Sequence, residues 1–529
     1  ESSAENQSDN NNKLKANRLN LKISNEWQLI LFFASLKLFV HFFTVSNFEL
    51  HRDAYLYYAQ SENLAWGYIS VPPSIAFIGK LSTSIFGNTV FGLRFFPALI
   101  GAVNLIVIGL FVKELGGKKI AIILASLAYL LSPSYLHTNA LFQPVAFNHF
   151  YWLLSGYLIL RMISRKNPKI WLWIAVVFGF AFLNKYSIVF FYTAFACALL
   201  LSKHRYLYRS RYFIMAIAIG LLIVSPNLLW QYENSWPVLQ HMRELRETQL
   251  VHVRYSDFIK AQFLMNIQAL LIWVFALILL LFYKKENKYR LFGLIYIFII
   301  LLLLAGSGKP YYSLGIYPIL FAFGAYFIEK YVRKYSAYVV GFLVISMFLS
   351  LYGSLSFDGI PFITPDKVKN KGAFRWEDGV NHDIPQDMAD MTGWKEIGEA
   401  VRDIYISLGK ENRDNCDIYC YHYGQAGAVM FYGKEIGIPQ PISPNGSFVF
   451  WAPDNLSKDY VIYVHSDLGN DVNPDTHLPQ LFEKVTLIKT IENKYFRENG
   501  TKIYLCESPN DDAKTIYKNM MKELKNNYR

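Results

Sequence analysis

The sequence predicts a multi-pass α-helical membrane protein with about eleven spans and a C-terminal α/β domain outside the cytosol. Of its 529 residues, 53% are hydrophobic and 17% aromatic, and the mean hydropathy is +0.20, which is too apolar for an ordinary soluble enzyme. Apolar runs of about 20 residues, long enough to cross a bilayer, recur up to residue 356. The basic residues that produce the net charge of +12 lie in short clusters between these runs, whereas a nucleic-acid-binding face would gather them in one domain.

The first 25 residues form a polar tail rich in Asn and Lys, which we expect in the cytosol. The first apolar run is too long for a signal peptide and no small-residue cleavage site follows it, so we interpret it as a retained anchor. The membrane domain is predicted at 26–356. Its spans are expected at 27–46, 90–112, 119–136, 145–162, 170–184, 186–202, 212–229, 262–283, 290–306, 311–328 and 337–356.

Five basic clusters predict the orientation. They lie at 113–119, 161–169, 203–211, 284–290 and 330–334. With the N-terminus in the cytosol all five fall in cytoplasmic connections, as the positive-inside rule requires. An odd number of spans then places the segment 357–529 outside the cytosol.

The extracytoplasmic parts are of two kinds. The connection 46–89 is too polar to span, and apolar residues at helical spacing in 56–64 and 74–86 predict short helices at the membrane surface. The segment 357–529 has more charge and shorter apolar runs, which indicates a separate α/β domain. Its strands are predicted at 417–421, 447–451, 459–465 and 501–506, and its helices at 392–408, with Thr392 as N-cap, and 512–524.

The stretch 51–73, HRDAYLYYAQSENLAWGYISVPP, contains the candidate catalytic residue. Asp53 follows the first span in a segment held at the membrane surface. An ionised carboxylate there can accept a proton from a hydroxyl, and a positioned base contributes roughly 10²–10⁴ in rate. The aromatic residues Tyr55, Tyr58 and Trp66 are suited to the faces of a sugar. The alternative is that Asp53 is a solvated loop residue or a helix cap.

Cations near the same face could bind a phosphate. If a group is transferred from a lipid phosphate, negative charge builds on the phosphate in a low-dielectric setting and needs compensation. The candidates are Arg94 at the head of the second span, Lys185, Lys309, Arg243 and Arg246. The two lysines are the more informative, because each is the lone basic residue of a very short turn. Their alternative role is snorkelling to the headgroups, and that of the last two arginines is a solvated helix face.

The cysteines and histidines give little indication of a metal site or of a disulfide. No Cys/His spacing matches a structural zinc site and no metal ligand set is evident, so we predict no cofactor and leave a divalent metal open. Cys416 and Cys420 are close enough in sequence to pair outside the cytosol, which would leave Cys506 over.

Six segments, taken in order, resemble the polyprenyl-phosphate-sugar-dependent glycosyltransferases, which include the dolichyl-phosphate-mannose protein mannosyltransferases and the bacterial lipid A aminoarabinose transferases. They are the stretch 51–73 given above, FGLRFFPALIGA, FQPVAFNHFYWLL, LNKYS, SPNLLWQYENSWPVLQ and GKPYYSLGIYPILFAFGA. The resemblance covers about residues 27–330. In the last domain YHYGQAGAVMFYG and ENGTKIYLC look like segments of bacterial members.

The resemblance implies a C-type glycosyltransferase fold, a polyprenyl-phosphate sugar donor, an acceptor at the outer face and inversion at the sugar carbon. The family's first-loop acid, its base, matches Asp53. Its cationic positions match Arg94, Lys185 and Lys309.

The chain departs from the family at several positions. Ala54 stands where members often have Glu, and Val71 where some have Lys before the Pro pair. Phe142–Gln143–Pro144 stands where many have Thr-Pro-Asp, so the second acid is missing, which puts a two-carboxylate scheme in doubt. Asn148 and His149 are candidates for the sugar or acceptor pocket, or alternatively a polar cap of the fourth span.

The sequence therefore predicts an integral glycosyltransferase of the plasma (inner) membrane that moves a sugar from a polyprenyl-phosphate donor to a protein, lipid A or glycan hydroxyl at the outer face. Membrane lipids are its surroundings and no nucleic acid is expected as partner. One alternative is a lipid-linked sugar binder or flippase without transfer chemistry. Another is that the outer domain does the work and the spans only anchor it, for which eleven spans are excessive.

Overall fold

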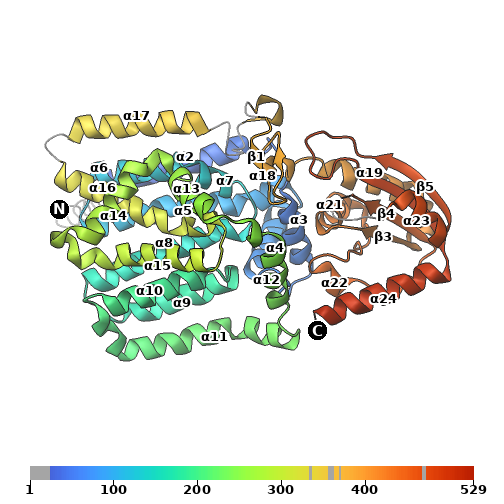
Figure 1. Ribbon diagram of the computed structural model, residues 1–529, viewed down its shortest axis with the longest axis horizontal. Coiled ribbons are helices and arrows are strands. Elements are labelled where there is room, and N and C mark those ends of the chain that lie inside the picture. The colour runs from blue at the N-terminus through green and yellow to red at the C-terminus, as the bar shows by residue number, and fades with distance from the viewer. Residues whose placement is uncertain (1–23, 333–335, 355–362, 369–370, 468–471, 529) are drawn as a thin grey trace, which may run out of the picture.

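The computed structural model describes residues 24–332, 336–354, 363–368, 371–467 and 472–528. Long helices form a bundle at one end of the molecule, and a domain with a β-sheet forms the other end (Figure 1). Short helices, among them α3 (Arg52–Glu62), α4 (Ser74–Phe86) and α12 (Pro237–Thr248), lie between the two. The first two of these confirm the helices predicted for the connection 46–89.

All eleven predicted apolar runs form helices. They are α2 (Asn25–Thr44), α5 (Val90–Leu115), α6 (Lys119–Leu130), α8 (Pro144–Ser164), α9 (Ile170–Asn184), α10 (Ile188–Leu201), α11 (Arg211–Glu233), α14 (Leu270–Phe282), α15 (Arg290–Ala305), α16 (Tyr317–Tyr331) and α17 (Ser336–Ser354). Among the described residues five helices are long and apolar enough to cross a membrane, and a sixth span arises if α13 (Tyr255–Leu264) and the helix after it form one bent crossing. The multi-pass helical architecture is confirmed, and the number eleven stays a prediction.

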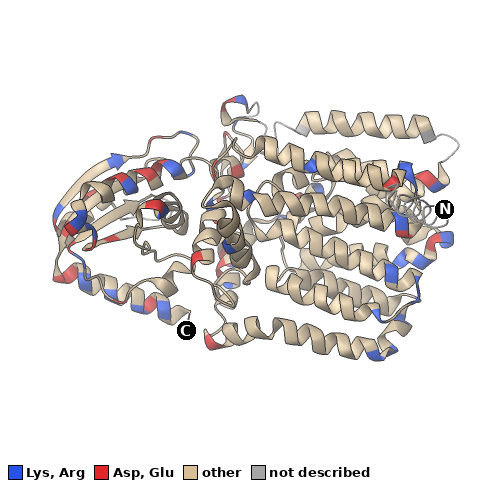
Figure 2. Cartoon of the chain, turned by 180° about the vertical axis from the view of Figure 1, so that it is seen from behind, with Lys and Arg blue, Asp and Glu red and all other residues tan. Residues whose placement is uncertain are grey.

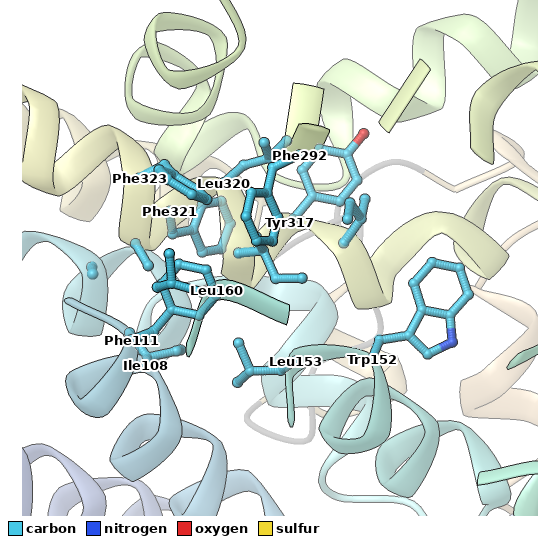
Figure 3. Close-up of a cluster of buried hydrophobic side chains, with 14 of the residues drawn as sticks. Ile108, Phe111, Trp152, Leu153, Leu160, Phe292, Tyr317, Leu320, Phe321 and Phe323 are labelled. Atoms are coloured by element: carbon cyan, nitrogen blue, oxygen red, sulfur yellow. The ribbon is translucent and has the colours of Figure 1, made fainter. Parts of the chain in front are cut away.

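The centre of the bundle is α16, which is buried on nearly every side, as expected of a helix that is apolar all round. Its neighbours are α5, α6, α8 and α14. Large side chains from α5, α8, α15 and α16 meet there (Figure 3): Phe111, Leu160, Phe292, Phe321 and Phe323. This core fixes the ends of the spans, and therefore the turns between them.

The charges of the bundle are unevenly distributed. Lys and Arg gather at the end that lies far from the sheet domain (Figure 2). This distribution agrees with the topology expected from the positive-inside rule. Which side of the membrane each end faces stays a prediction.

The C-terminal domain has a four-stranded mixed sheet in the order β3-β4-β6-β5. The first two neighbours, β3 (Cys416–Cys420) and β4 (Tyr460–His465), are parallel, and β6 (Lys502–Pro509) is antiparallel to both β4 and β5 (Phe482–Thr490). A hairpin of β1 (Phe374–Arg375) and β2 (Asn381–His382) precedes the sheet. The helices of this half are α18 (Gln386–Ala389), α19 (Trp394–Ser407), α20 (Gly409–Arg413), α21 (Tyr423–Gly433), α22 (Phe448–Trp451), α23 (Pro474–Leu481) and α24 (Asp511–Asn527).

Three details of this domain differ from the sequence prediction. The segment 447–451 is not a strand but contains the short helix α22, because a brief apolar run looks the same in a buried strand and a buried helix. Strand β5 was missed because its residues are mostly exposed. Thr392 is not the N-cap of α19: its hydroxyl donates to the carbonyl of Met388, and Gly393 caps the helix.

The pairing of Cys416 with Cys420, which the sequence left open, does not form in the structure. Both lie on one strand, four residues apart, and both are buried free thiols. Four residues of extended chain separate their Cα atoms by about 13 Å. A disulfide needs about 7 Å or less.

Candidate active site

Helix α3 presents Asp53 in its first turn. The ring of His51 caps the helix, since its Nδ1 accepts a hydrogen bond from the backbone N–H of Asp53 at 3.1 Å. A carboxylate at this place is favoured by the helix dipole. Tyr57 lies one turn further along and therefore shares the face of Asp53.

The Asp53 carboxylate is held by groups from three parts of the chain. Tyr423 in α21 donates its hydroxyl to Oδ1 at 2.7 Å, and the Gln143 amide lies 3.5 Å from Oδ2. Burial raises the pKa of Asp53, but the positive charges around it, those of Arg52 and Lys309 among them, and the Tyr423 hydrogen bond bring it below its usual value. The group is therefore ionised near neutral pH. Its side chain is 31% exposed, so a hydroxyl can reach it.

Lys185 and Lys309 lie near Asp53. The Lys309 charge lowers the pKa of Asp53, and both Asp53 and Lys309 affect the pKa of Lys185. Lys185 lies in the short turn between α9 and α10, with its Nζ 6.0 Å from the centre of the Tyr312 ring. Burial, assisted by the charge of nearby Lys309 and opposed by that of Asp53, lowers the pKa of Lys185 to about 8. Lys309 precedes the 3₁₀ turn 310–316, and its ammonium donates to the Gln249 side chain at 2.5 Å. The two lysines predicted as phosphate ligands are thus brought together with the candidate base.

An internal carboxylate occupies this cationic region. Glu377, in the β1–β2 hairpin, lies 3.0 Å from Arg497, 3.5 Å from Arg52 and 3.6 Å from Lys309. Burial raises the pKa of Glu377, but the three cations lower it to below its usual value. The site therefore contains several cations that a substrate anion could share.

Arg94 has a different environment from the one predicted. It is 5% exposed, and its guanidinium donates to the backbone carbonyls of Val45, Phe48 and Glu49. These carbonyls belong to the segment that joins the first span to α3. Arg94 thus fixes the chain before Asp53, and this geometry does not support a place in the phosphate site.

The aromatic residues predicted for a sugar pocket are not gathered at Asp53. Tyr55 and Tyr58 are fully buried against Phe431 in α21, and the Tyr55 hydroxyl lies 3.1 Å from that of Tyr432. They hold α3 to the C-terminal domain. Trp66 is half exposed and packs against Phe77.

The polar pair at the start of α8 is buried. Asn148 donates to the Ser187 hydroxyl at 3.3 Å, and the ring of His149 packs edge-on against Tyr135. Both contacts are internal to the bundle and match the alternative of a polar helix cap better than a sugar pocket.

Arg243 and Arg246 line a separate recess. Both are exposed on α12, and with Glu247, Leu250, Val251 and Ser307 they surround a cavity of about 610 Å³. Ser307 is two residues from Lys309, so the recess opens next to the lysine turn. Arg243 is therefore placed to contact a part of a ligand that lies in this recess, rather than the part that lies at Asp53.

The sequence did not identify several residues of the site. Tyr423, Glu377 and Arg497 belong to the C-terminal half, and no local pattern marks them. His241 in α12 also lies near Asp53 and Lys185, and burial lowers its pKa. Tyr57 could have been predicted from the sequence, because it lies four residues after Asp53 and therefore on the same face of a helix.

A further group, His51, Asp387 and Asp390, brings one ligand atom from each residue to within 4.8 Å of one another, close enough to hold a metal ion. No local sequence pattern marks this group, because the two acids are more than 330 positions away from the histidine. Both acids already have partners: Arg497 lies 3.2 Å from Asp390, and His137 lies 2.7 Å from Asp387. Each of the two acids thus already has a side-chain partner.

Comparison with known proteins gives a family match over part of the chain and a fold for most of it. Residues 70–230 match the family described as dolichyl-phosphate-mannose-protein mannosyltransferase. A curated relative, the lipid A galacturonosyltransferase RgtD of Rhizobium johnstonii, is 25% identical over 215 residues, which is 40% of this chain and only 45% of the relative.

The solved structures of ArnT from Cupriavidus metallidurans cover far more of the chain. The structure bound to undecaprenyl phosphate aligns with 90% of this chain and 97% of its own, with a TM-score of 0.60 and 13% identity. The apo structure aligns with 91% of this chain at the same TM-score. This shared architecture shows that the chain has the multi-pass fold of the ArnT structures, which is the C-type glycosyltransferase fold that its sequence motifs predicted.

Proposed function

We propose that this protein is a membrane glycosyltransferase that moves a sugar from a polyprenyl-phosphate donor to an acceptor hydroxyl. The observation that carries the proposal is the convergence of a partly exposed, ionised Asp53 with Lys185 and Lys309, each from a different connection of the bundle. A base and a pair of cations are the groups that such a transfer requires. The family match and the ArnT fold support the same reaction class.

In the proposed reaction Asp53 takes the proton of the acceptor hydroxyl as its oxygen attacks the anomeric carbon. The bond between that carbon and the phosphate oxygen breaks, and its electron pair stays on the phosphate. Attack from the side opposite the leaving group inverts the sugar carbon. Lys185 and Lys309 compensate the negative charge that the departing phosphate gains, which lowers the barrier most where water is excluded.

Lipid A is the acceptor that the name of the curated relative favours, and other envelope glycans and proteins are the alternatives. The basic end of the bundle supports a cytoplasmic placement of that end in the inner membrane, with the site and the C-terminal domain on the opposite side. In this arrangement residues 1–25 are a cytoplasmic tail, 26–356 the membrane domain and 357–529 the extracytoplasmic domain.

The test is the transfer rate of purified Asp53→Asn, measured as release of free undecaprenyl phosphate from an undecaprenyl-phosphate sugar in the presence of lipid A. We expect a loss of about 10²–10⁴ in rate with the donor still bound. Glu62→Gln, which changes a carboxylate at the other end of α3 paired with Lys80 and Lys434, is the matched control. A native rate in Asp53→Asn would overturn the assignment of the base.

The same assay separates transfer from transport. A flippase or a sugar binder would leave the bond between sugar and phosphate intact, and no free polyprenyl phosphate would accumulate. Accumulation in step with glycosylated acceptor supports the transferase.

A further inference from the structure

The hydroxyl of Tyr423 makes the shortest hydrogen bond to Asp53, and it comes from the C-terminal domain. It donates to Oδ1 at 2.7 Å across 370 positions of sequence. The Arg52 guanidinium lies over the same ring, 5.6 Å from its centre. Tyr423 thus contacts both the candidate base and the residue before it.

The backbone around Tyr423 is fixed. Tyr423 is the first residue of α21, whose N-terminus is closed by a capping box: the His422 ring accepts from the Gly424 N–H, and the Gln425 side chain accepts from the His422 N–H. The other end of the Gln425 amide donates to buried Glu498 at 2.7 Å. The hydroxyl is therefore held on a closed helix end rather than on a loose loop.

Helices α21 and α3 also touch at backbone distance. A Cβ built on Gly427 would lie 2.5 Å from the carbonyl oxygen of Tyr55, and one on Gly424 would lie 2.8 Å from Cγ of Arg52. Only glycine permits this approach. The distance from the Tyr423 hydroxyl to Asp53 is consequently set by the contact of the two helices.

We infer that Tyr423 is a positioning residue for the transfer reaction, and that the C-terminal domain is thereby part of the active site. This inference rests on the proposed role of Asp53 as the base. By donating to Oδ1, the Tyr423 hydroxyl fixes the rotation of the carboxylate and directs Oδ2 to the acceptor. An unfixed carboxylate would sample other rotations, and a base must lie within hydrogen-bond reach of the proton it takes.

The experiment compares the full-length Tyr423→Phe protein with the wild type, using the undecaprenyl-phosphate sugar as donor and lipid A as acceptor. The phenylalanine keeps the ring under Arg52 and removes only the hydroxyl. We expect kcat to fall about tenfold or more, because a hydrogen bond to a charged group is lost, while the KM for the donor stays within about twofold. Binding of undecaprenyl phosphate alone, at the wild-type affinity, verifies that the variant is folded.

Tyr432→Phe is the control. It removes a hydroxyl from the same helix, at the contact with Tyr55 rather than with Asp53, and should leave kcat unchanged. A double variant adds a readout that a purely structural role would not give: in the Asp53→Asn background, Tyr423→Phe should have no further effect on the residual rate.

The outcomes are distinguishable. An unchanged kcat in Tyr423→Phe, with Asp53→Asn inactive, overturns this inference and leaves the proposed function standing. A raised donor KM with unchanged kcat also overturns it, since Tyr423 would then act on the donor. A fully active Asp53→Asn overturns the proposed base, and the inference with it.

Discussion

The Oε2 atom of Glu377 lies 3.6 Å from the ammonium of Lys309. A lysine proposed to bind the donor's phosphate thus already has an internal anion beside it, and Arg52 and Arg497 share the same carboxylate. A sugar phosphodiester carries one negative charge, the same as a carboxylate. We therefore expect the donor's phosphate to replace Glu377 as the anion beside Lys309.

The first prediction concerns this exchange. In Glu377→Gln the competing charge is gone while the size of the side chain is kept, so the donor should bind more tightly. We expect the donor KM to fall severalfold, as a neighbouring partly exposed charge changes binding by about 1 kcal/mol. Initial rates over a range of donor concentrations measure it.

Asp378→Asn is the control for that variant, because the next residue in the hairpin contacts His382 rather than the cations. An unchanged or higher KM in Glu377→Gln would show that Glu377 orients the cations for the donor instead of competing with it.

The second prediction is a pH dependence from Lys185. Burial lowers the pKa of its ammonium to about 8, so that in the free protein the positive charge is complete well below pH 8 and is lost as the pH rises above it. Affinity for the donor's phosphate should therefore fall above pH 8. Equilibrium binding of undecaprenyl phosphate between pH 6.5 and 9.5 measures it.

Lys185→Arg provides the matched variant, since a guanidinium stays charged over this range. Its binding curve should be flat above pH 8. A wild-type curve that is equally flat would mean that Lys185 does not share the phosphate.

The third prediction separates structure from binding at Arg94. Arg94→Ala leaves three buried backbone carbonyls without their donor, and we expect the protein to lose about 3 kcal/mol or more of stability. Thermal unfolding in detergent measures the loss. The folded fraction should keep the wild-type affinity for undecaprenyl phosphate. A large loss of affinity in a variant of unchanged stability would instead show that Arg94 binds the phosphate.

The fourth prediction concerns the contact between α3 and α21. Gly427→Ala places a methyl group against the backbone of Tyr55, so the two helices must separate and the rate should fall even though residue 427 contacts no substrate group. Gly341→Ala in α17, where a Cβ meets nothing within 4 Å, should be silent. Transfer rates of the two variants side by side decide the point, and equal rates would contradict it.

Those residues of the candidate site that stand out in a local sequence pattern could be predicted from the sequence. Asp53 at the end of the first span, and Lys185 and Lys309 as lone cations in short turns, were found because span ends and charges can be read along the chain. Their meeting follows from the bundle, and the motifs predicted its fold.

The contacts across the interface could not be predicted in this way. Tyr55 and Tyr58 were assigned to a sugar pocket because tyrosines near a carboxylate suit a sugar, yet a helix has several faces and theirs meets α21. Tyr423 and Glu377 lie more than 300 positions from Asp53, and only the docked domain shows that Tyr423 reaches Asp53 and that Glu377 reaches Lys309.

The docking of α21 on α3 has a consequence for synthesis. Helix α3 ends at Glu62 and its partner α21 begins at Tyr423, so α3 is made well before the helix on which it packs. A chain interrupted after α17 would possess Asp53 and both lysines but would lack Tyr423, Arg497 and Glu377. On the inference drawn above, such a chain would lack the hydrogen bond that orients Asp53, so the full transfer rate would be reached only after the C-terminal domain has been translated.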